Sequence, residues 1–202
     1  MSQSLQIVGI LNITPDSYYD GGKYVGIDAA VKQAGDMLCS GADWIEVGGE
    51  STGPGSTDVS VEEELKRTIP IVTGIRQHFP KAKISIDTYK AEVALAAIDA
   101  GATMINDVTA SRYVPPPRRE GVRGRGSDSM FDIISRTNIH LVLMYSKDHC
   151  PRTTVQDVQY DDVVATIKEF LKERKQAAVS AGISPNRIIL DPGMGHFVSS
   201  DP

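Results

Sequence analysis

The chain has 202 residues, of which 41% are hydrophobic and 23% are charged, and its formal net charge at pH 7 is -5. This length supports one substantial hydrophobic core or at most two small ones, and the negative charge gives no broad electrostatic basis for binding nucleic acid or a membrane surface. The apolar runs are too short to span a bilayer. Two cysteines, Cys39 and Cys150, are too few for a disulfide framework, so we expect a cytoplasmic protein.

Short apolar runs rich in β-branched residues alternate with segments of helical periodicity along the chain. In chain order they predict a strand at 5–11, a helix at 27–40, a strand at 44–47, a helix at 61–78, a strand at 83–86, a helix at 90–100, a strand at 104–106, a helix at 131–136, a strand at 140–144, a helix at 161–181 and a strand at 187–190.

Local signals support several of these helix boundaries. Ser60 precedes the second helix and Glu63 follows three residues later, which predicts a capping box. Three helices end at a glycine that is followed by a short turn and a strand, and a glycine there suits a left-handed backbone conformation. These glycines are Gly41, Gly101 and Gly182.

The strict alternation of strands and helices predicts a parallel sheet with right-handed crossovers. An open doubly wound sheet would gather its site at one switch point, whereas a barrel uses all its strand ends. Polar residues follow nearly every predicted strand, so we favour a (β/α) barrel of the TIM type. A complete barrel has about eight units and about 250 residues. We therefore expect an incomplete barrel of about six βα units, a single domain over residues 1–202 that is a fragment of a longer chain.

The polar residues at the strand ends suggest a ligand site. Asp87, Asn106 and Asp191 each follow a short apolar strand, and such a set suits a flat heterocycle with alternating donors and acceptors. The alternative is that they cap helices, as Asp and Asn often do. After the first two strands lie the polar residue Asn12 and the glycine-rich loop 48–55, which is either a turn or a place where the backbone approaches an anion.

The chain resembles the dihydropteroate synthase family, which belongs to the folate pathway and is a target of sulfonamides. The resemblance covers about residues 7–195, and six motifs carry it in the family's order: "GILNITPDSYYDGG", "IEVGGESTGPG", "VSVEEELKRTIPIV", "ISIDTYKAEVA", "GATMINDV" and "ILDPGMG". It implies a TIM barrel and a transferase. The reaction would condense 6-hydroxymethyl-7,8-dihydropterin diphosphate with p-aminobenzoate, giving 7,8-dihydropteroate and diphosphate, with Mg²⁺ as cofactor.

The resemblance also implies roles for residues around the pterin. Asp87, Asn106 and Asp191 would bind the pterin ring. Asp20, in the first loop, would help to stabilise the cationic pterin fragment that forms as diphosphate leaves. The catalytic set is therefore expected to be Asp20, Asp87 and Asp191.

The remaining roles concern the metal and the second substrate. Asn12 would bind the magnesium–diphosphate end, Thr52 would lie against the substrate, and Pro54 would line the p-aminobenzoate pocket. His196 takes the aromatic position of that pocket, where it either stacks on the substrate or is a loop histidine without that role. A homodimer is common in the family.

Departures from the family pattern keep other interpretations open. Gly53 stands where the family usually has an arginine, and residues 112–130 are rich in proline, glycine and arginine, which predicts a disordered insertion. The family's seventh and eighth strand motifs, with a pterin-binding lysine and an Arg–His pair, are absent from these residues, so we expect this chain alone to be nearly inactive. The alternative is a truncated or degenerate paralogue that binds pterin without catalysis; a related methyltransferase is less favoured.

Overall fold

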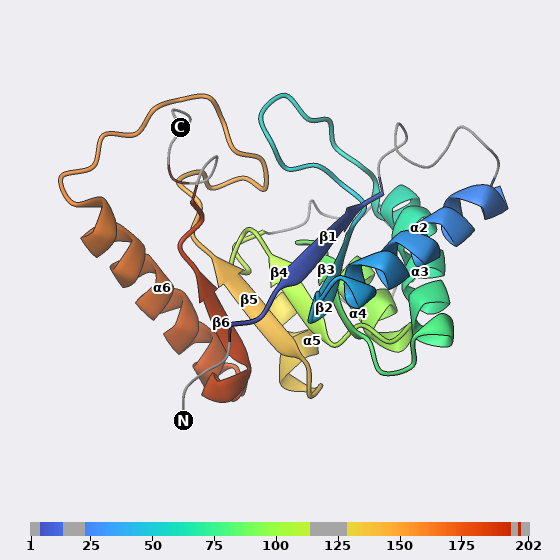
Figure 1. The fold of residues 1–202 in the computed structure, drawn as a ribbon. Coiled ribbons are helices and arrows are strands. Elements are labelled where there is room, and N and C mark those ends of the chain that lie inside the picture. The colour runs from blue at the N-terminus through green and yellow to red at the C-terminus, as the bar shows by residue number, and fades with distance from the viewer. Residues whose placement is uncertain (1–4, 14–22, 114–128, 195–197, 199–202) are drawn as a thin grey trace, which may run out of the picture. The chain divides into compact units, whose positions relative to one another are not determined.

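The computed structural model of the protein describes residues 5–13, 23–113, 129–194 and 198. Figure 1 shows its elements, which in chain order are β1 (Val8–Asn12), α2 (Lys23–Cys39), β2 (Trp44–Gly48), α3 (Val61–His78), β3 (Lys83–Asp87), α4 (Ala91–Asp99), β4 (Met104–Asp107), α5 (Met130–Ser135), β5 (His140–Met144), α6 (Val163–Ser180), the 3₁₀ turn η1 (Pro185–Arg187) and β6 (Ile188–Asp191).

The strands form one sheet in the order β1-β2-β3-β4-β5-β6. Helices separate consecutive strands, and the pairs β1–β2, β2–β3 and β5–β6 are parallel. This confirms the predicted α/β fold with about six βα units. The order of strands has two ends, so the barrel is not closed among the described residues, as expected for an incomplete barrel.

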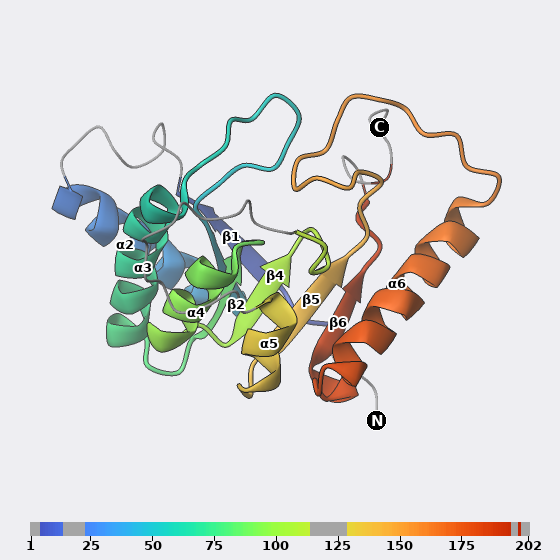
Figure 2. The same cartoon turned by 180° about the vertical axis from the view of Figure 1, so that it is seen from behind.

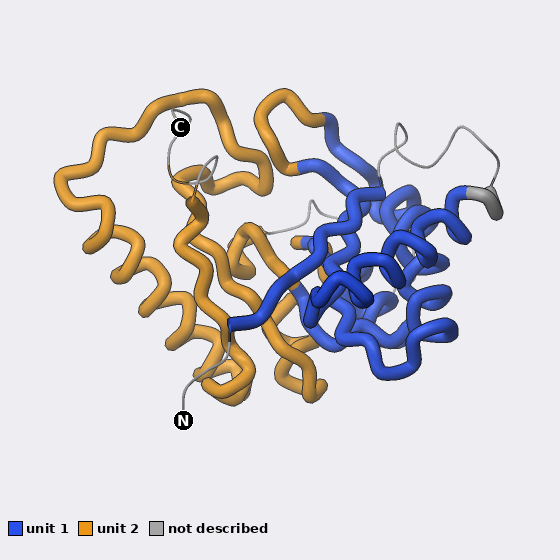
Figure 3. The backbone as a smooth tube through the Cα atoms, viewed as in Figure 1, with its two compact units in different colours: residues 1–51, 57–88, 92–105 blue, residues 52–56, 89–91, 106–202 orange. Residues whose placement is uncertain are grey.

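Two compact units divide the chain (Figure 3). The first contains residues 1–51, 57–88 and 92–105, and the second contains residues 52–56, 89–91 and 106–202. In the first unit, β1, β2 and β3 pair side by side, and α2 and α3 run next to each other in Figure 1. Its fully buried side chains include Leu11, Ile45, Val47, Ile84 and Ile86.

The second unit is built on β5 and β6, and Figure 2 shows α6 running beside them from behind. Its core includes Ile134, Leu141 and Leu143, each fully buried. The guanidinium of Arg187 donates to the carbonyl oxygens of Thr137 at 2.8 Å and of Ile139 at 3.0 Å. One arginine therefore holds the turn before β6 against the turn before β5.

The strand boundaries differ from the predictions in an informative way. Four strands extend past the last apolar residue and include the polar side chain that was expected to follow them: Asn12, Asp87, Asp107 and Asp191. Periodicity ends a strand where apolar residues stop, whereas parallel pairing continues for as long as the neighbouring backbone offers partners. The predicted site residues Asn12, Asp87 and Asp191 therefore lie on hydrogen-bonded strands rather than in loops. Within the described residues, no helix is both long and apolar enough to cross a membrane.

The helix ends were predicted with mixed success. Gly41, Gly101 and Gly182 have φ values of 100°, 112° and 96°, which confirms the predicted left-handed conformation. The capping box at α3 was only half right. Ser60 accepts the backbone N–H of Glu63 at 3.2 Å, but the Glu63 carboxylate pairs with Arg67 instead of returning to the cap.

Candidate functional site

A row of three residues crosses the ends of β1, β2 and β3 in the first unit. The strand register pairs Asn12 with Gly48 and Gly48 with Asp87. A Cβ atom at Gly48 would lie 3.4 Å from Asn12 Oδ1 and 3.8 Å from Asp87 Oδ2. The amide and carboxylate oxygens therefore flank a gap that exists because residue 48 has no side chain.

A second polar layer lies beneath this row on the same face, since residues two apart on a strand point to the same side. Its members in register are Ile10, Glu46 and Ser85. Ser85 is fully buried, and its hydroxyl donates to Glu46 Oε2 at 3.0 Å. The carboxylate of Glu46 is thus fixed one layer below Asp87, which adds negative charge to this face of the sheet.

The first turns of α3 support the backbone that follows β2. Gly49 packs so closely that a Cβ there would lie 2.6 Å from Thr68 Cγ2. Arg67 donates to the carbonyl oxygen of Gly49 at 3.0 Å, and Glu50 accepts the backbone N–H of Val59 at 3.3 Å. Arg67 of helix α3 therefore holds the start of the glycine-rich loop.

The predicted residues Thr52 and Pro54 belong to the second unit. Thr52 is partly buried, and its carbonyl oxygen accepts the backbone N–H of Thr153 at 3.2 Å. Pro54 is exposed in a tight turn that Gly53 begins, where Ser56 Oγ donates to the Gly53 carbonyl oxygen at 2.7 Å. The structure thus ties Thr52 to the loop after β5 and leaves Pro54 accessible.

Asn106 and Asp107 stand at the end of β4. Asn106 is partly buried, whereas Asp107 is fully buried. Burial raises the pKa of Asp107, and hydrogen bonds from Thr109 and Ser111 act in the opposite direction. Asp107 is therefore held inside the protein by its own turn, whereas Asn106 keeps partial exposure although its Oδ1 atom is buried.

Asp191 ends β6 and belongs to the same unit as Asn106. Its Oδ1 accepts the backbone N–H of Gly193 at 2.8 Å, and its carbonyl oxygen accepts the backbone N–H of Tyr145 at 2.9 Å. Gly193 has a φ of 68°, a conformation that favours glycine. The turn after β6 is therefore built around Asp191, and these bonds fix where the carboxylate lies.

Some predicted residues cannot be placed. Asp20 and His196 lie outside the described residues, as do residues 114–128 of the predicted insertion. Asp87 belongs to the first unit, whereas Asn106 and Asp191 belong to the second. The structure brings Asn12 and Asp87 together around Gly48, while a shared pterin site of Asp87 with Asn106 and Asp191 stays a prediction.

An arginine that sequence reasoning assigned to the insertion is well anchored in the structure. Arg112 donates to the carbonyl oxygens of Ser146 at 3.1 Å and Asp148 at 2.8 Å, and its guanidinium lies 4.7 Å from the centre of the Phe170 ring. Burial, followed by the charge of Arg174, lowers the pKa of Arg112. No motif marked this residue, because its partners are backbone carbonyls distant in sequence.

The loop after β5 folds around an ion pair. The Lys147 side chain is fully buried and donates to Asp148 Oδ2 at 2.9 Å and to the carbonyl oxygen of Thr154 at 2.8 Å. Asp148 also accepts the backbone N–H and the hydroxyl of Thr154. Burial opposes these bonds, but together they hold the pKa of Asp148 below its ordinary value.

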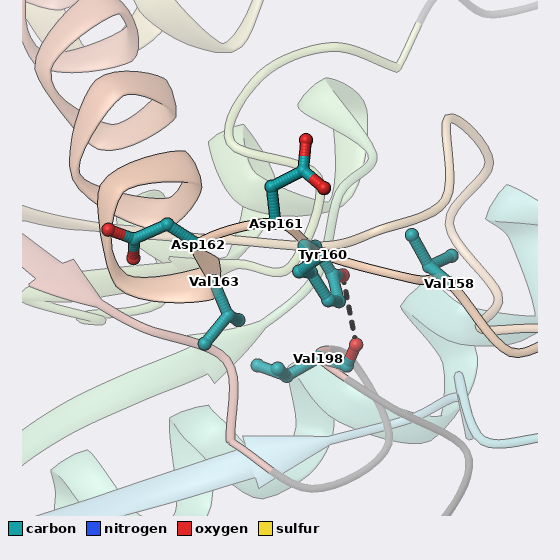
Figure 4. A pocket seen from close by; sticks show the side chains of 6 residues that line it. All are labelled: Val158, Tyr160, Asp161, Asp162, Val163 and Val198. Atoms are coloured by element: carbon teal, nitrogen blue, oxygen red, sulfur yellow. Dashed lines mark hydrogen bonds between the residues drawn. The ribbon is translucent and has the colours of Figure 1, made fainter.

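A pocket of about 540 Å³ lies where this loop meets α6 (Figure 4). Tyr160 donates to the carbonyl oxygen of Val198 at 2.9 Å and shares a 3.1 Å hydroxyl contact with Tyr145. The carboxylates of Asp161 and Asp162 point away from Val198 in the figure. None of the predicted site residues lines this pocket.

The residues around Gly48 fit a magnesium ion only in a limited sense. Mg²⁺ prefers oxygen donors and is commonly bound by one or two protein ligands together with substrate phosphates and water. Asn12 Oδ1 and the Asp87 carboxylate are such donors. Among the described residues, no group of three or more His, Cys, Asp or Glu side chains could form a metal cage. The donor set therefore fits an ion that a diphosphate helps to hold.

Comparison with known proteins gives a consistent result. Residues 8–201 match the profile of the family described as pterin binding enzyme. The dihydropteroate synthase of Clostridium beijerinckii is 41% identical over 189 residues, which is 94% of this chain and 62% of that protein. The chain thus spans 62% of the length of this curated relative.

Two solved structures of Xanthomonas albilineans dihydropteroate synthase are also similar. The structure with 4-aminobenzoic acid has a TM-score of 0.77 and 40% identity, covering 94% of this chain and 62% of that one. The complex with 7,8-dihydropteroate has a TM-score of 0.73 and 37% identity, covering 95% and 61%. These TM-scores show that the elements of this chain are arranged as in those proteins.

Proposed function

We propose that this chain, which belongs to the family of pterin-binding enzymes, carries most of the pterin site of a dihydropteroate synthase. The observation that carries the proposal is the row of Asn12, Gly48 and Asp87, held in register at the ends of three parallel strands. In barrels of this type, ligands bind at the carboxyl ends of the strands. The reaction that we propose is that of the relatives named dihydropteroate synthase.

The first substrate is 6-hydroxymethyl-7,8-dihydropterin diphosphate. Asp87, Asn106 and Asp191 bind the pterin ring, since carboxylates accept paired N–H groups and an amide can both donate and accept. Because Gly48 has no side chain, no Cβ atom lies between the side-chain oxygens of Asn12 and Asp87. Asn12 then faces the diphosphate.

The reaction breaks the bond between the pterin methylene carbon and the diphosphate oxygen, and the electron pair leaves with diphosphate. The cation that remains is delocalised into the ring, where the negative charges of Asp87 and Asp191 stabilise it. Asp20 has the same role in the proposal. The amine nitrogen of p-aminobenzoate then bonds to the methylene carbon and releases a proton.

Mg²⁺, when bound, supplies positive charge to the leaving diphosphate. We assign Asn12 to this ion, because its Oδ1 is an oxygen donor of the kind that Mg²⁺ prefers. The second substrate, p-aminobenzoate, would lie against Thr52 and Pro54, with His196 at its aromatic position. The amine is a weak nucleophile, so positioning it accounts for most of what the protein must do.

The proposal includes the setting of the enzyme. Cys39 and Cys150 are both free and exposed, which suits the reducing cytoplasm. We also propose a homodimer, on the resemblance to the family. Sedimentation velocity over a range of protein concentrations tests this, and a species of monomer mass throughout that range would contradict it.

Pterin binding tests the site directly. The 202-residue chain is titrated with 6-hydroxymethylpterin while ligand fluorescence is followed, and we expect saturable binding. Asp87→Asn should weaken it by about tenfold to a hundredfold, because a charged acceptor is lost. Asp99→Asn, at an exposed position at the end of α4, is the control and should bind like the unchanged chain. Equal affinities for all three proteins would contradict the proposal.

Turnover separates the enzyme from a protein that only binds pterin. The full-length gene product is incubated with pterin diphosphate, p-aminobenzoate and Mg²⁺, and released diphosphate is measured. Release that requires p-aminobenzoate supports the synthase. Pterin binding without release supports the non-catalytic alternative.

A further inference from the structure

The turn that follows Asn106 has an unusual backbone. Ala110 and Ser111 have φ values of 50° and 60°, and they are the non-glycine residues with positive φ among the described part of the chain. Two such residues in succession are costly, and this conformation persists only where surrounding contacts enforce it. The side chains of Asp107 and Arg174 both contact the turn, in addition to its own backbone bond from the Ala110 N–H to the Asp107 carbonyl oxygen at 3.0 Å and the bond from Arg112 Nε to the Thr109 carbonyl oxygen at 3.1 Å.

Asp107 holds the turn from inside. Its Oδ1 accepts the backbone N–H of Thr109 at 2.8 Å and the Thr109 hydroxyl at 2.7 Å, while its Oδ2 accepts the backbone N–H of Ser111 at 2.9 Å. The side chain is fully buried, so each of these bonds replaces water that the carboxylate has lost. One carboxylate thereby ties two residues of the turn, Thr109 and Ser111, to the end of β4.

Arg174 holds the same turn from α6. Its Nε donates to the carbonyl oxygen of Ala110 at 2.9 Å, and a second guanidinium nitrogen donates to that of Ser111 at 3.3 Å. The guanidinium also lies 5.2 Å from the centre of the Phe131 ring, which fixes its orientation. Its charge acts on Asp107, where it counteracts the rise in pKa that burial causes.

Asp107 is the neighbour of Asn106 in the chain, and Arg174 contacts the same turn four and five residues after Asn106. Asp107 is the next residue in β4, so its side chain and backbone set the direction in which the strand ends. If the turn relaxed, the peptide between the two residues would rotate and the Asn106 carboxamide would move with it. A carboxamide binds a heterocycle well only when its donor and acceptor face the matching ring atoms.

We propose that Asp107 and Arg174 are positioning residues, which aim the Asn106 carboxamide at the pterin through the strained turn of residues 107–111. The inference rests on the proposed function, because it assumes that Asn106 binds the pterin. Neither side chain is assigned a contact with substrate. Arg174, on a helix that follows β5, thereby becomes part of the recognition of the ring.

A double-mutant cycle separates positioning from general support of the fold. We expect Arg174→Met to weaken 6-hydroxymethylpterin binding by about tenfold. The matched control is Lys172→Met, an exposed lysine of the same helix, which should leave the affinity unchanged. In the background of Asn106→Ala, Arg174→Met should have little further effect, because the group that it aims is gone.

A second measurement does not depend on the ligand. In the ligand-free chain, the side-chain amide resonances of Asn106 in a ¹⁵N–¹H spectrum should shift in Arg174→Met and Asp107→Asn, but not in Lys172→Met. Arg174→Lys serves as the milder variant if Arg174→Met does not fold.

The outcomes are distinct. If the chain binds pterin but neither the affinity nor the Asn106 resonances change in the Arg174 variants, the positioning role is wrong. It is also wrong if the losses from Arg174→Met and Asn106→Ala multiply. If the resonances shift and no pterin binds, the turn does orient Asn106 while the proposed function fails.

Discussion

The two adjacent glycines at the end of β2 have different reasons for lacking a side chain. A Cβ at Gly49 would lie 2.6 Å from Thr68 Cγ2 and 3.1 Å from Glu64 Cγ, and both of these side chains are buried. A Cβ at Gly48 would meet its nearest atom, Asn12 Oδ1, at 3.4 Å. Gly48 therefore keeps a space open, whereas the missing side chain at Gly49 lets α3 pack against the strand.

Gly49→Ala should lower the free energy of unfolding by about 1–3 kcal/mol, because the added methyl group overpacks α3 against β2. Gly48→Ala is the matched control. It should lower the free energy of unfolding less, since its methyl group would lie 3.4 Å from the nearest atom, Asn12 Oδ1. Urea unfolding followed by circular dichroism measures both. A Gly49→Ala protein as stable as the Gly48→Ala protein would show that α3 does not pack as described.

Asp148 makes a pH-dependent contribution to stability. Its pKa is lowered from 3.8, so the folded protein gains stability from its ionised form. That contribution is complete above the unfolded-state pKa and is lost as the pH falls through the folded-state value. The physical origin lies in the bonds from Thr154 and from the buried Lys147, with burial acting against them.

Asp148→Asn should cost about 1–3 kcal/mol of unfolding free energy at pH 7, because the buried ammonium of Lys147 loses its charged partner. The loss relative to the unchanged chain should shrink as the pH falls below about 4. Thermal unfolding between pH 3 and pH 7 measures this. Asp161→Asn, at an exposed position, is the control; a constant difference across this range would contradict the assignment.

At the scale of elements, α3 serves as the support of the glycine-rich loop. Ser60 caps its start, and Arg67 reaches back to Gly49 while pairing with Glu63 at 2.9 Å. Lys66 lies on the same helix and approaches Glu63 at 3.6 Å from a more exposed position. The two neighbouring cations therefore contribute differently, since only Arg67 holds the loop.

Arg67→Met should lower the free energy of unfolding by about 1.5–3 kcal/mol, the range for hydrogen bonds to charged groups. Lys66→Met should change it by less than about 1 kcal/mol, as expected for an exposed ion pair. Hydrogen exchange of the backbone amides after β2 should quicken only in the Arg67 variant. Equal changes in unfolding free energy in the two variants would contradict the role assigned to Arg67.

The elements were largely predictable, and the reasons for success and failure are physical. Periodicity located every strand, because buried parallel strands are apolar on both faces. It missed the extension of β1 to Asn12 and of β6 to Asp191, because backbone pairing carries no sequence signal. Motifs indicated Asn12, Asp87 and Asn106, whereas Arg174 escaped notice because it acts on backbone carbonyls and looks like any solvated helix cation.

On the scale of the whole molecule, apolar side chains remain exposed on the outermost strands of the sheet order. Val8 and Ile10 of β1 are 41% and 59% exposed, and Ile189 and Leu190 of β6 are 43% and 41% exposed. Exposed apolar surface on strands at the edge of a sheet favours association. Each unit therefore offers a surface for self-association.

We expect the 202-residue chain to associate with increasing concentration. Ile10→Lys combined with Leu190→Lys should shift the association to higher concentration, because charged residues on an edge strand oppose pairing. Val155→Lys changes an exposed loop valine and is the control. Sedimentation equilibrium measures all three; association that the strand substitutions leave unchanged would place the contact elsewhere.

Because the gap at Gly48 depends on a missing side chain, mutation can remove it more easily than restore it. Its shape is set by atoms that are absent, and every substitution of glycine by another amino acid adds atoms. Between Asn12 and Asp87 there is space for about a methyl group, so a branched residue at position 48 would more than fill this space. The backbone pairing of the strands does not depend on that side chain. A single codon change could therefore close this site without unfolding the protein, and only a return to glycine would reopen it.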